Sequence, residues 1–203
     1  MTQEKIIEKA YELFTKNGVK VVTIDRLVAE LHTSKRTIYK YFKDKDELLA
    51  ACITIYHQKV KNENEALIHS APNAIAAMAF LHQKILERYY TINSNFYADI
   101  YRFHPKLEPV LEQAGSYARD EMLYLANWGI EDGIFIDDLD IEVVGTTVLH
   151  LLRLFKDNQK FPVDKFSKER LTFFTVVPYL RGLCTPKGLK LLEKQEELFR
   201  VSI

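Results

Sequence analysis

The sequence predicts an all-α fold, in which an N-terminal unit of three short helices is followed by a larger helical C-terminal domain. Apolar residues recur at intervals of three and four along most of the chain, as they do on the buried faces of helices. Only seven glycines and six prolines interrupt the 203 residues, and no long alternating run suggests paired strands. This length fits one large domain, or a small domain joined to a larger one.

The composition is that of an ordinary soluble protein. The 28 basic and 28 acidic residues cancel, so the total charge points to no partner, although a neutral total can hide a basic patch. No apolar run approaches the roughly 20 residues of a membrane span, and no signal-peptide core opens the chain. Cys52 and Cys184 show no metal or disulfide spacing and are interpreted as free thiols. We therefore expect a cytoplasmic protein that binds no metal, cofactor or membrane.

The N-terminal helices are bounded by recognisable caps. Apolar spacing from Ile6 to Phe14 predicts a first helix that ends at Asn17-Gly18, and residues 19–22 form a connector. Thr23 is a good N-cap for a second helix, whose apolar stripe runs to residue 31. The break at residues 32–34 precedes a third helix, which Ser34 caps and which is expected to run to Tyr41. Asp44 and Glu47 form a capping-box pattern that opens a fourth, longer helix.

The remaining chain also favours helices, with Pro178 expected to kink or locally disturb one of them. We expect a loop rather than a hairpin at residues 132–136, because no alternating run follows. The expected helices span residues 72–92, 93–104, 105–128, 140–156, 163–183 and 187–200.

The third helix carries a local concentration of positive charge. Residues 35–45 contain five basic residues against the single acidic Asp44. A charge run alone is typical of a solvated helix face. Here, however, the helix is short, follows another helix after a tight turn, and carries tyrosines beside its cations, which is the pattern of a helix-turn-helix. With Ile38 and Phe42 toward the core, Arg36, Thr37 and Lys40 face outward, where they could meet phosphates or base edges.

The segment TIDRLVAELHTSKRTIYKYFKDKDELL resembles the signature of the TetR family of one-component transcriptional regulators. The resemblance is specific to about residue 50 and only architectural beyond residue 60. Two positions depart from the usual pattern: Leu31-His32 stands where Ala-Gly is common, and Arg36 where Gly or Ala is common. The matching positions are Thr23, Ile24, Ala29, Ser34, Lys35, Thr37, Ile38, Tyr39, Tyr41, Phe42, Lys45 and Leu48.

The resemblance implies a homodimeric repressor that binds a near-palindromic operator in double-stranded DNA and is released by a small-molecule effector. It implies a helix-turn-helix DNA-binding domain at residues 1–46 and a ligand-binding and dimerisation domain at residues 47–203. Arg36, Thr37 and Lys40 are then expected to face bases. The residues expected to contact mainly phosphates are Thr23, Ser34, Lys35, Thr37, Tyr39, Tyr41 and Lys45.

The chain from residue 89 to residue 128 is rich in aromatic residues. Such a segment suits either a pocket for a largely apolar molecule or an ordinary aromatic core, and the TetR resemblance favours the pocket. His82 and His104, on apolar helices, are interpreted as structural. The candidate ligand-binding residues are Phe96, Tyr97, Tyr101, Phe103, Tyr117, Tyr124 and Trp128.

The last two long helices are apolar over more than one face. This favours a dimer interface, with burial inside one chain as the alternative. The candidate interface residues are Thr147, Val148, Leu152, Phe155, Phe173 and Val177.

No phosphate-binding glycine loop and no HExxH motif occurs, so we expect no enzyme. The alternatives left open are a ligand-independent DNA-binding regulator or activator, and an all-helical enzyme or interaction module.

Overall fold

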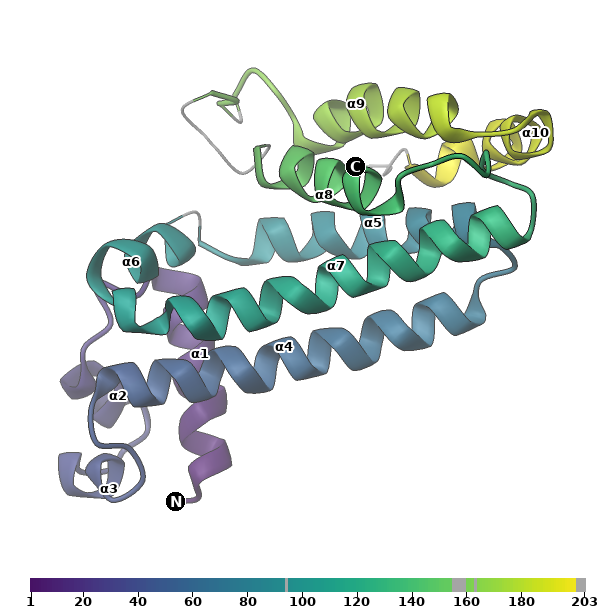
Figure 1. Cartoon of the computed structure of the whole chain (residues 1–203). Coiled ribbons are helices and arrows are strands. Elements are labelled where there is room, and N and C mark those ends of the chain that lie inside the picture. Colours follow the sequence, from purple (N-terminus) through teal and green to yellow (C-terminus); the bar gives the residue numbers. More distant parts are fainter. Residues whose placement is uncertain (94, 155–159, 163, 200–203) are drawn as a thin grey trace. The chain divides into compact units, whose positions relative to one another are not determined.

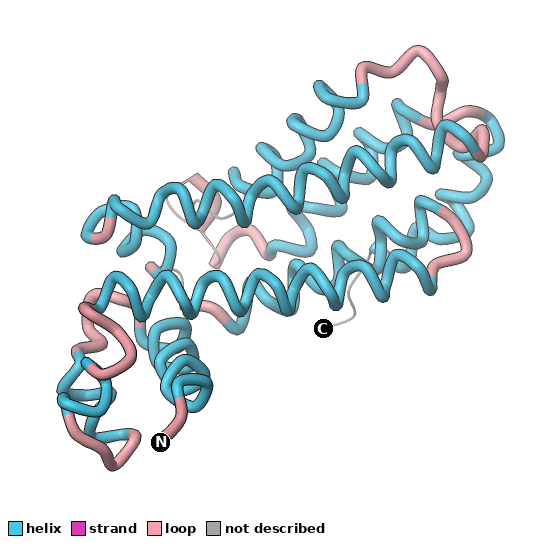
Figure 2. The backbone as a smooth tube through the Cα atoms, turned by 60° about the horizontal axis from the view of Figure 1, so that its bottom comes forward, coloured by secondary structure: helices cyan, strands magenta, loops and turns pink. Residues whose placement is uncertain are grey.

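The computed structural model describes residues 1–93, 95–154, 160–162 and 164–199, and within these ranges it is helical (Figure 1). The elements are α1 Gln3–Asn17, α2 Ile24–Glu30, α3 Lys35–Tyr39, α4 Lys45–Ser70, α5 Ala74–Thr91, α6 Phe96–Phe103, η1 Pro105–Leu107, α7 Glu108–Glu131, α8 Ile141–Leu154, α9 Lys168–Leu183, α10 Pro186–Gln195 and η2 Glu196–Phe199. In the described part of the chain the only strand-like pairing is an isolated bridge between Phe135 and Cys184 (Figure 2). The all-α prediction is confirmed.

Internal contacts divide the chain into two compact units. Unit 1 comprises residues 1–62 and 88–115, and unit 2 comprises residues 63–87 and 116–203. Helices α4, α5 and α7 therefore each contribute residues to both units. These units describe packing, whereas the functional boundary expected between residues 46 and 47 stays a prediction.

Unit 1 is built around a core to which α1, α2, α3, α4, α6 and α7 contribute. Phe14 from α1, Leu27 from α2 and Ile38 from α3 are each about 1% exposed, and they pack with Leu48 of α4 and Ile100 of α6 in one cluster. Burying an aliphatic or aromatic side chain of this size contributes roughly 1.5–3 kcal/mol, so this cluster is what holds the short helices in place.

The predicted caps of the first helices are present. The Thr23 hydroxyl accepts a hydrogen bond from the Arg26 amide at 3.2 Å, and Asp44 Oδ1 accepts one from the Glu47 amide at 2.9 Å. Gly18 has φ +88° with an extended ψ of 151°, so it uses the positive φ that favours glycine without adopting the left-handed helical conformation.

The third helix is shorter than the sequence predicts, because it ends at Tyr39 instead of Tyr41. The amides of Tyr41 and Phe42 both donate to the Ile38 carbonyl, at 3.0 and 3.1 Å, which closes the helix in a turn.

Unit 2 contains the C-terminal helices, in which α8 packs against α9 and α9 against α10. The segment expected as a loop after residue 132 is held against the end of α9, since the Ile136 amide donates to the Leu183 carbonyl at 3.0 Å. Helix α7 continues past its expected end at Trp128 to Glu131. It does so through Gly129, where a Cβ atom would lie only 2.1 Å from Cδ2 of Phe135.

The other boundaries differ by a few residues from expectation. Helix α5 begins at Ala74, capped by Asn73, rather than at Pro72. Helix α9 begins at Lys168, where the Ser167 hydroxyl caps the Arg170 amide, and it continues through Pro178. The expected end of α8 at Lys156 and the expected start of α9 at Val163 lie outside the described residues.

Candidate functional site

Helices α2 and α3 are joined by a tight turn that the local hydrogen bonds define. The His32 amide donates to the Ala29 carbonyl at 3.2 Å, and the Thr33 amide to the Val28 carbonyl at 3.1 Å. His32 has φ +47°, and it is the one non-glycine residue in the described chain with positive φ. Glycine is common at this position in the signature that the sequence resembles. His32 adopts the positive φ that glycine favours, although it is not a glycine.

The buried side of α3 fixes which residues face outward. Ile38 and Phe42 are 1% and 2% exposed and belong to the unit 1 core. Consequently Arg36, Tyr39 and Lys40 are exposed, and the outward face of the helix is cationic, as predicted.

A shallow polar depression lies on this face. Lys40 Nζ stands 5.6 Å from the centre of the Tyr41 ring, whose hydroxyl donates to the Met1 carbonyl at 3.3 Å. The hydroxyls of Ser34 and Thr37 lie 3.0 Å apart, and Ser34 also caps the Thr37 amide. The depression therefore combines two cations with hydroxyl groups, which suits phosphate and base-edge contacts. It is lined by Met1, Thr33, Ser34, Arg36, Thr37, Lys40 and Tyr41.

Two of the predicted phosphate contacts have other partners in this structure. Lys35 Nζ pairs with Asp25 Oδ1 at 2.8 Å, and that hydrogen bond raises the pKa of Lys35. The half-buried Lys45 donates from Nζ to the Val19 carbonyl at 2.6 Å and lies over the Phe14 ring. Burial lowers the pKa of Lys45, against the opposing effect of Asp99 and Asp46. Lys45 thus supports the connector between α1 and α2, and its predicted contact with DNA stays a prediction.

The seven aromatic residues predicted to bind a ligand are distributed over both units. Phe96 and Tyr97 pack in or against the unit 1 core, whereas Tyr101 and Phe103 are 60% and 42% exposed. The other three, on the part of α7 that belongs to unit 2, are Tyr117, Tyr124 and Trp128.

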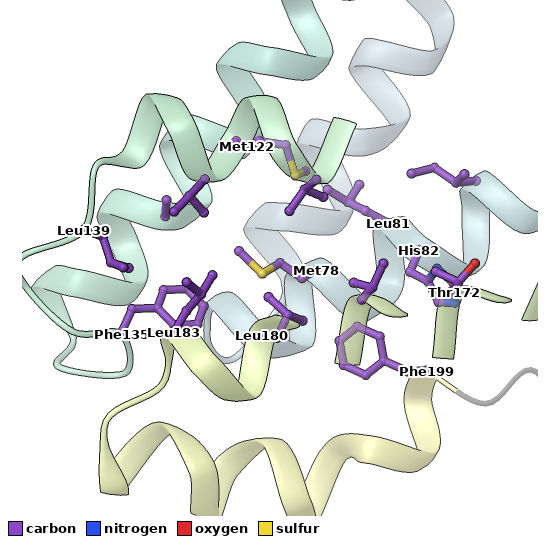
Figure 3. A pocket seen from close by; sticks show the side chains of 16 residues that line it. Met78, Leu81, His82, Met122, Phe135, Leu139, Thr172, Leu180, Leu183 and Phe199 are labelled. Carbon is purple, nitrogen blue, oxygen red and sulfur yellow. The ribbon is translucent and has the colours of Figure 1, made fainter. Parts of the chain in front are cut away.

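Unit 2 contains an apolar cavity that none of these seven residues lines (Figure 3). Its volume is about 50 Å³, and almost all of its lining is apolar. Apolar residues occur on every long helix of the chain, so no sequence pattern singled out this lining. The lining residues are Met78, Leu81, His82, Ile85, Met122, Ala126, Phe135, Leu139, Val144, Gly145, Val148, Thr172, Val176, Leu180, Leu183 and Phe199.

One histidine lines this cavity. His82 is 5% exposed, its ring lies 5.8 Å from that of Phe199, and its Nε2 has no hydrogen-bond partner in the described chain. Burial lowers the pKa of His82 to about 4, against the opposing effects of the Phe199 carbonyl and of Glu169. His104, in contrast, is held by Asp46 at 2.5 Å in unit 1.

The candidate dimer residues are partly buried within this chain. Val177 is 2% exposed and Phe173 packs against the same unit 2 core, while Val148 lines the cavity. The Thr147 hydroxyl donates to the Val143 carbonyl at 2.8 Å. The side chain of Leu152 and the whole of Phe155 lie outside the described residues. Nearby on α8 and α9, Val143 and Phe174 are 59% and 67% exposed.

Comparison with known proteins supports the resemblance and extends it to the whole fold. The model for bacterial regulatory proteins of the tetR family matches residues 6–52. A TetR transcription regulator from Haloarcula marismortui is 21% identical, with a TM-score of 0.75 over 90% of this chain and 98% of that chain. The reduced form of NemR from E. coli is 12% identical, with a TM-score of 0.75 over 91% and 98%.

A third solved structure is that of the transcriptional regulator FadR from Bacillus subtilis in complex with stearoyl-CoA. It is 15% identical to this chain, with a TM-score of 0.65 over 92% of this chain and 99% of that chain. No curated protein matches the sequence. In the described residues, no helix is both long enough and apolar enough to cross a membrane.

Proposed function

Because the chain belongs to the TetR family of bacterial regulatory proteins and is a DNA-binding regulator of transcription, we propose that it is a repressor released from its operator by a small, largely apolar ligand. The observation that carries the proposal is the apolar cavity in unit 2, in a chain whose unit 1 presents the cationic face of α3. The complex of the structurally similar FadR with stearoyl-CoA supports a ligand with a large apolar part.

The proposed DNA contacts follow from the exposed face of α3. Arg36 and Lys40 carry unpaired charge toward solvent in the described structure, so they are the side chains proposed to reach the bases of the major groove. Ser34, Thr37 and Tyr41 surround them and position the helix on phosphates. A homodimer would present two such helices to a near-palindromic operator, with half-sites about 34 Å or a multiple apart.

The size of the cavity gives a reason for ligand-dependent release. A volume of about 50 Å³ is well below the roughly 300–1,000 Å³ of ordinary ligand pockets. An effector must therefore widen the cavity, and it binds more tightly to an arrangement in which the lining helices have moved apart. Such a difference in affinity between two arrangements is the condition for a ligand to shift their populations. Helices α5 and α7 carry lining residues and also contribute residues to unit 1, so they are the proposed route to the DNA-binding face.

A gel-shift titration on the intergenic DNA beside the gene tests the DNA-binding part. The double variant Arg36→Ala, Lys40→Ala should lose affinity and sequence preference. The matched control is Lys190→Ala, Lys194→Ala, which removes two exposed cations from α10. If the two doubles behave alike, the assignment of the α3 face is wrong.

Footprinting with and without candidate effectors tests the ligand-gated part. Loss of the footprint on adding an apolar effector, with derepression of the adjacent gene, supports the repressor. A footprint that survives a broad panel of apolar compounds supports instead a regulator that needs no ligand, and activation of the gene would identify an activator.

A further inference from the structure

We propose that His82 is the polar anchor of the unit 2 cavity, and that the effector is an uncharged, largely apolar molecule whose single hydroxyl group hydrogen-bonds to His82 Nε2. The inference deepens the proposed function and rests on it, because it takes the cavity as the effector site.

The imidazole of His82 is a buried polar group in the wall of the cavity. His82 is 5% exposed and lines the cavity, yet its Nε2 has no hydrogen-bond partner in the described chain. Buried polar atoms in folded proteins are nearly always hydrogen-bonded, so an unsatisfied buried nitrogen on a side chain that lines a cavity requires an explanation. A ligand group that bonds to Nε2 would remove the free-energy penalty of the unsatisfied atom.

The described lining of the cavity has its polar side chains at one end. Figure 3 shows His82 of α5 with Thr172 of α9 and Phe199 of η2 at one end of the cavity, while Phe135 and Leu139 lie toward the other. The polar side chains are therefore gathered at one end, and the rest of the lining is apolar. A molecule that fits this arrangement has one polar group and an apolar body that extends away from it.

The charge of the lining limits the charge that a ligand can carry. Among the described residues, no lysine, arginine, aspartate or glutamate lines the cavity, so an ionised ligand group would be buried there without a lining partner of opposite charge. Burial keeps His82 itself uncharged at neutral pH, since its pKa is lowered to about 4. A neutral imidazole has one N–H donor and one acceptor nitrogen. A hydroxyl group can both donate and accept, and it therefore satisfies Nε2 in either tautomer.

The test compares two probes of nearly equal shape, 4-ethylphenol and 4-ethyltoluene, which differ by a hydroxyl in place of a methyl group. Their dissociation constants are measured by calorimetry for the full-length wild type, for His82→Phe and for Met78→Leu. Phenylalanine keeps an aromatic ring beside Phe199 but has no nitrogen, whereas Met78→Leu alters the lining without changing its polarity. The ratio of the two constants is compared between each variant and the wild type, and this comparison cancels the difference in hydrophobicity between the probes.

We expect the preference for 4-ethylphenol to fall by about fivefold to tenfold in His82→Phe, which corresponds to one hydrogen bond to a buried group. In Met78→Leu the ratio should stay as in the wild type. An unchanged ratio in His82→Phe overturns the inference, and so does a wild type that binds neither probe. If a buried water rather than the ligand bonded to Nε2, His82→Phe would keep the preference for 4-ethylphenol, and the inference would be overturned.

A measurement on the wild type alone avoids dependence on the folding of the variant. In protein labelled with ¹⁵N at its six histidines, the Nε2 resonance of His82 should move on addition of 4-ethylphenol and not on addition of 4-ethyltoluene. Equal responses to both probes refute the hydroxyl contact. If 4-ethylphenol contacts His82 but does not release the protein from operator DNA, the His82 contact is supported and the proposed ligand-released repressor is refuted.

Discussion

Asp25 should weaken DNA binding, because its carboxylate pairs with Lys35, the cation at the start of α3. Lys35 Nζ lies 2.8 Å from Asp25 Oδ1, and neither side chain is buried. A cation that is already paired releases no counterion from DNA when it approaches a phosphate. In Asp25→Asn, Lys35 is free to take a phosphate as its partner, so the variant should bind DNA more tightly at low salt and with a steeper salt dependence.

The expected size follows from the number of charges. One additional phosphate contact steepens the slope of log K against log salt by about 0.9 per half-site, so the affinity advantage of the variant should shrink by about threefold per half-site between 50 and 200 mM salt. By the same reasoning, Lys40→Ala should make the slope shallower by about 0.9, since Lys40 stands over the Tyr41 ring with no acidic partner among its described contacts. Lys35→Ala should change the slope much less.

The assay is fluorescence anisotropy with operator DNA at several salt concentrations. Glu87→Gln is the control, because Glu87 forms a similarly exposed ion pair with Lys84 in unit 2 and its loss changes the net charge equally. If Asp25→Asn and Glu87→Gln have the same slope, or if Lys35→Ala lowers the slope as much as Lys40→Ala, the reasoning from the Asp25–Lys35 pair is refuted.

Three further predictions concern stability, each measured by thermal or urea unfolding of the full chain. His32→Val should be about 1–2 kcal/mol less stable than His32→Gly, because φ at this position is +47°, and equal stabilities would contradict that conformation. Gly129→Ala should lose about 1–3 kcal/mol, because its Cβ would lie 2.1 Å from the buried Phe135 ring, and an unchanged midpoint would show that the ring has room to move. The pKa of His82 is lowered to about 4 in the folded chain, whereas in the unfolded chain it has its ordinary value near 6.5. Between these two pH values the unfolded chain therefore binds more protons than the folded chain. The free energy of unfolding should therefore rise with pH across that window, and it should rise less steeply in His82→Phe. An identical pH profile in this variant would show that another group causes the pH dependence.

The sequence was sufficient to predict the helix-turn-helix because its signals are local. The Thr23, Ser34 and Asp44 caps each bond to an amide three residues later, so the pattern can be recognised without knowing the tertiary structure. The short connections and the buried spacing of Ile38 and Phe42 are equally local. The same reasoning was less accurate at helix ends, where the last turn depends on packing.

The partners of the charged and aromatic residues could not be predicted in this way. Lys45 bonds to the carbonyl of Val19, 26 residues earlier, a contact that no local pattern indicates. The cavity forms where side chains from several helices of unit 2 meet, and most of them are aliphatic. Counting aromatic residues therefore emphasised α6 and the aromatic side chains of α7, whereas the lining depends on the tertiary packing of Met122 and Ala126 of α7 with residues of α5, α8 and α9.

The length of α3 has a consequence for how DNA-binding activity is lost. A helix of five residues cannot form by itself in water, because nucleating a helix is unfavourable and so short a segment gains too few hydrogen bonds to compensate. Its conformation is supplied by Ile38 and by the Ser34 cap, and hence by the cooperative folding of unit 1. Affinity for DNA should therefore also depend on the local stability of this core, because partial opening of unit 1 would remove the cationic face of α3 even while unit 2 stays folded.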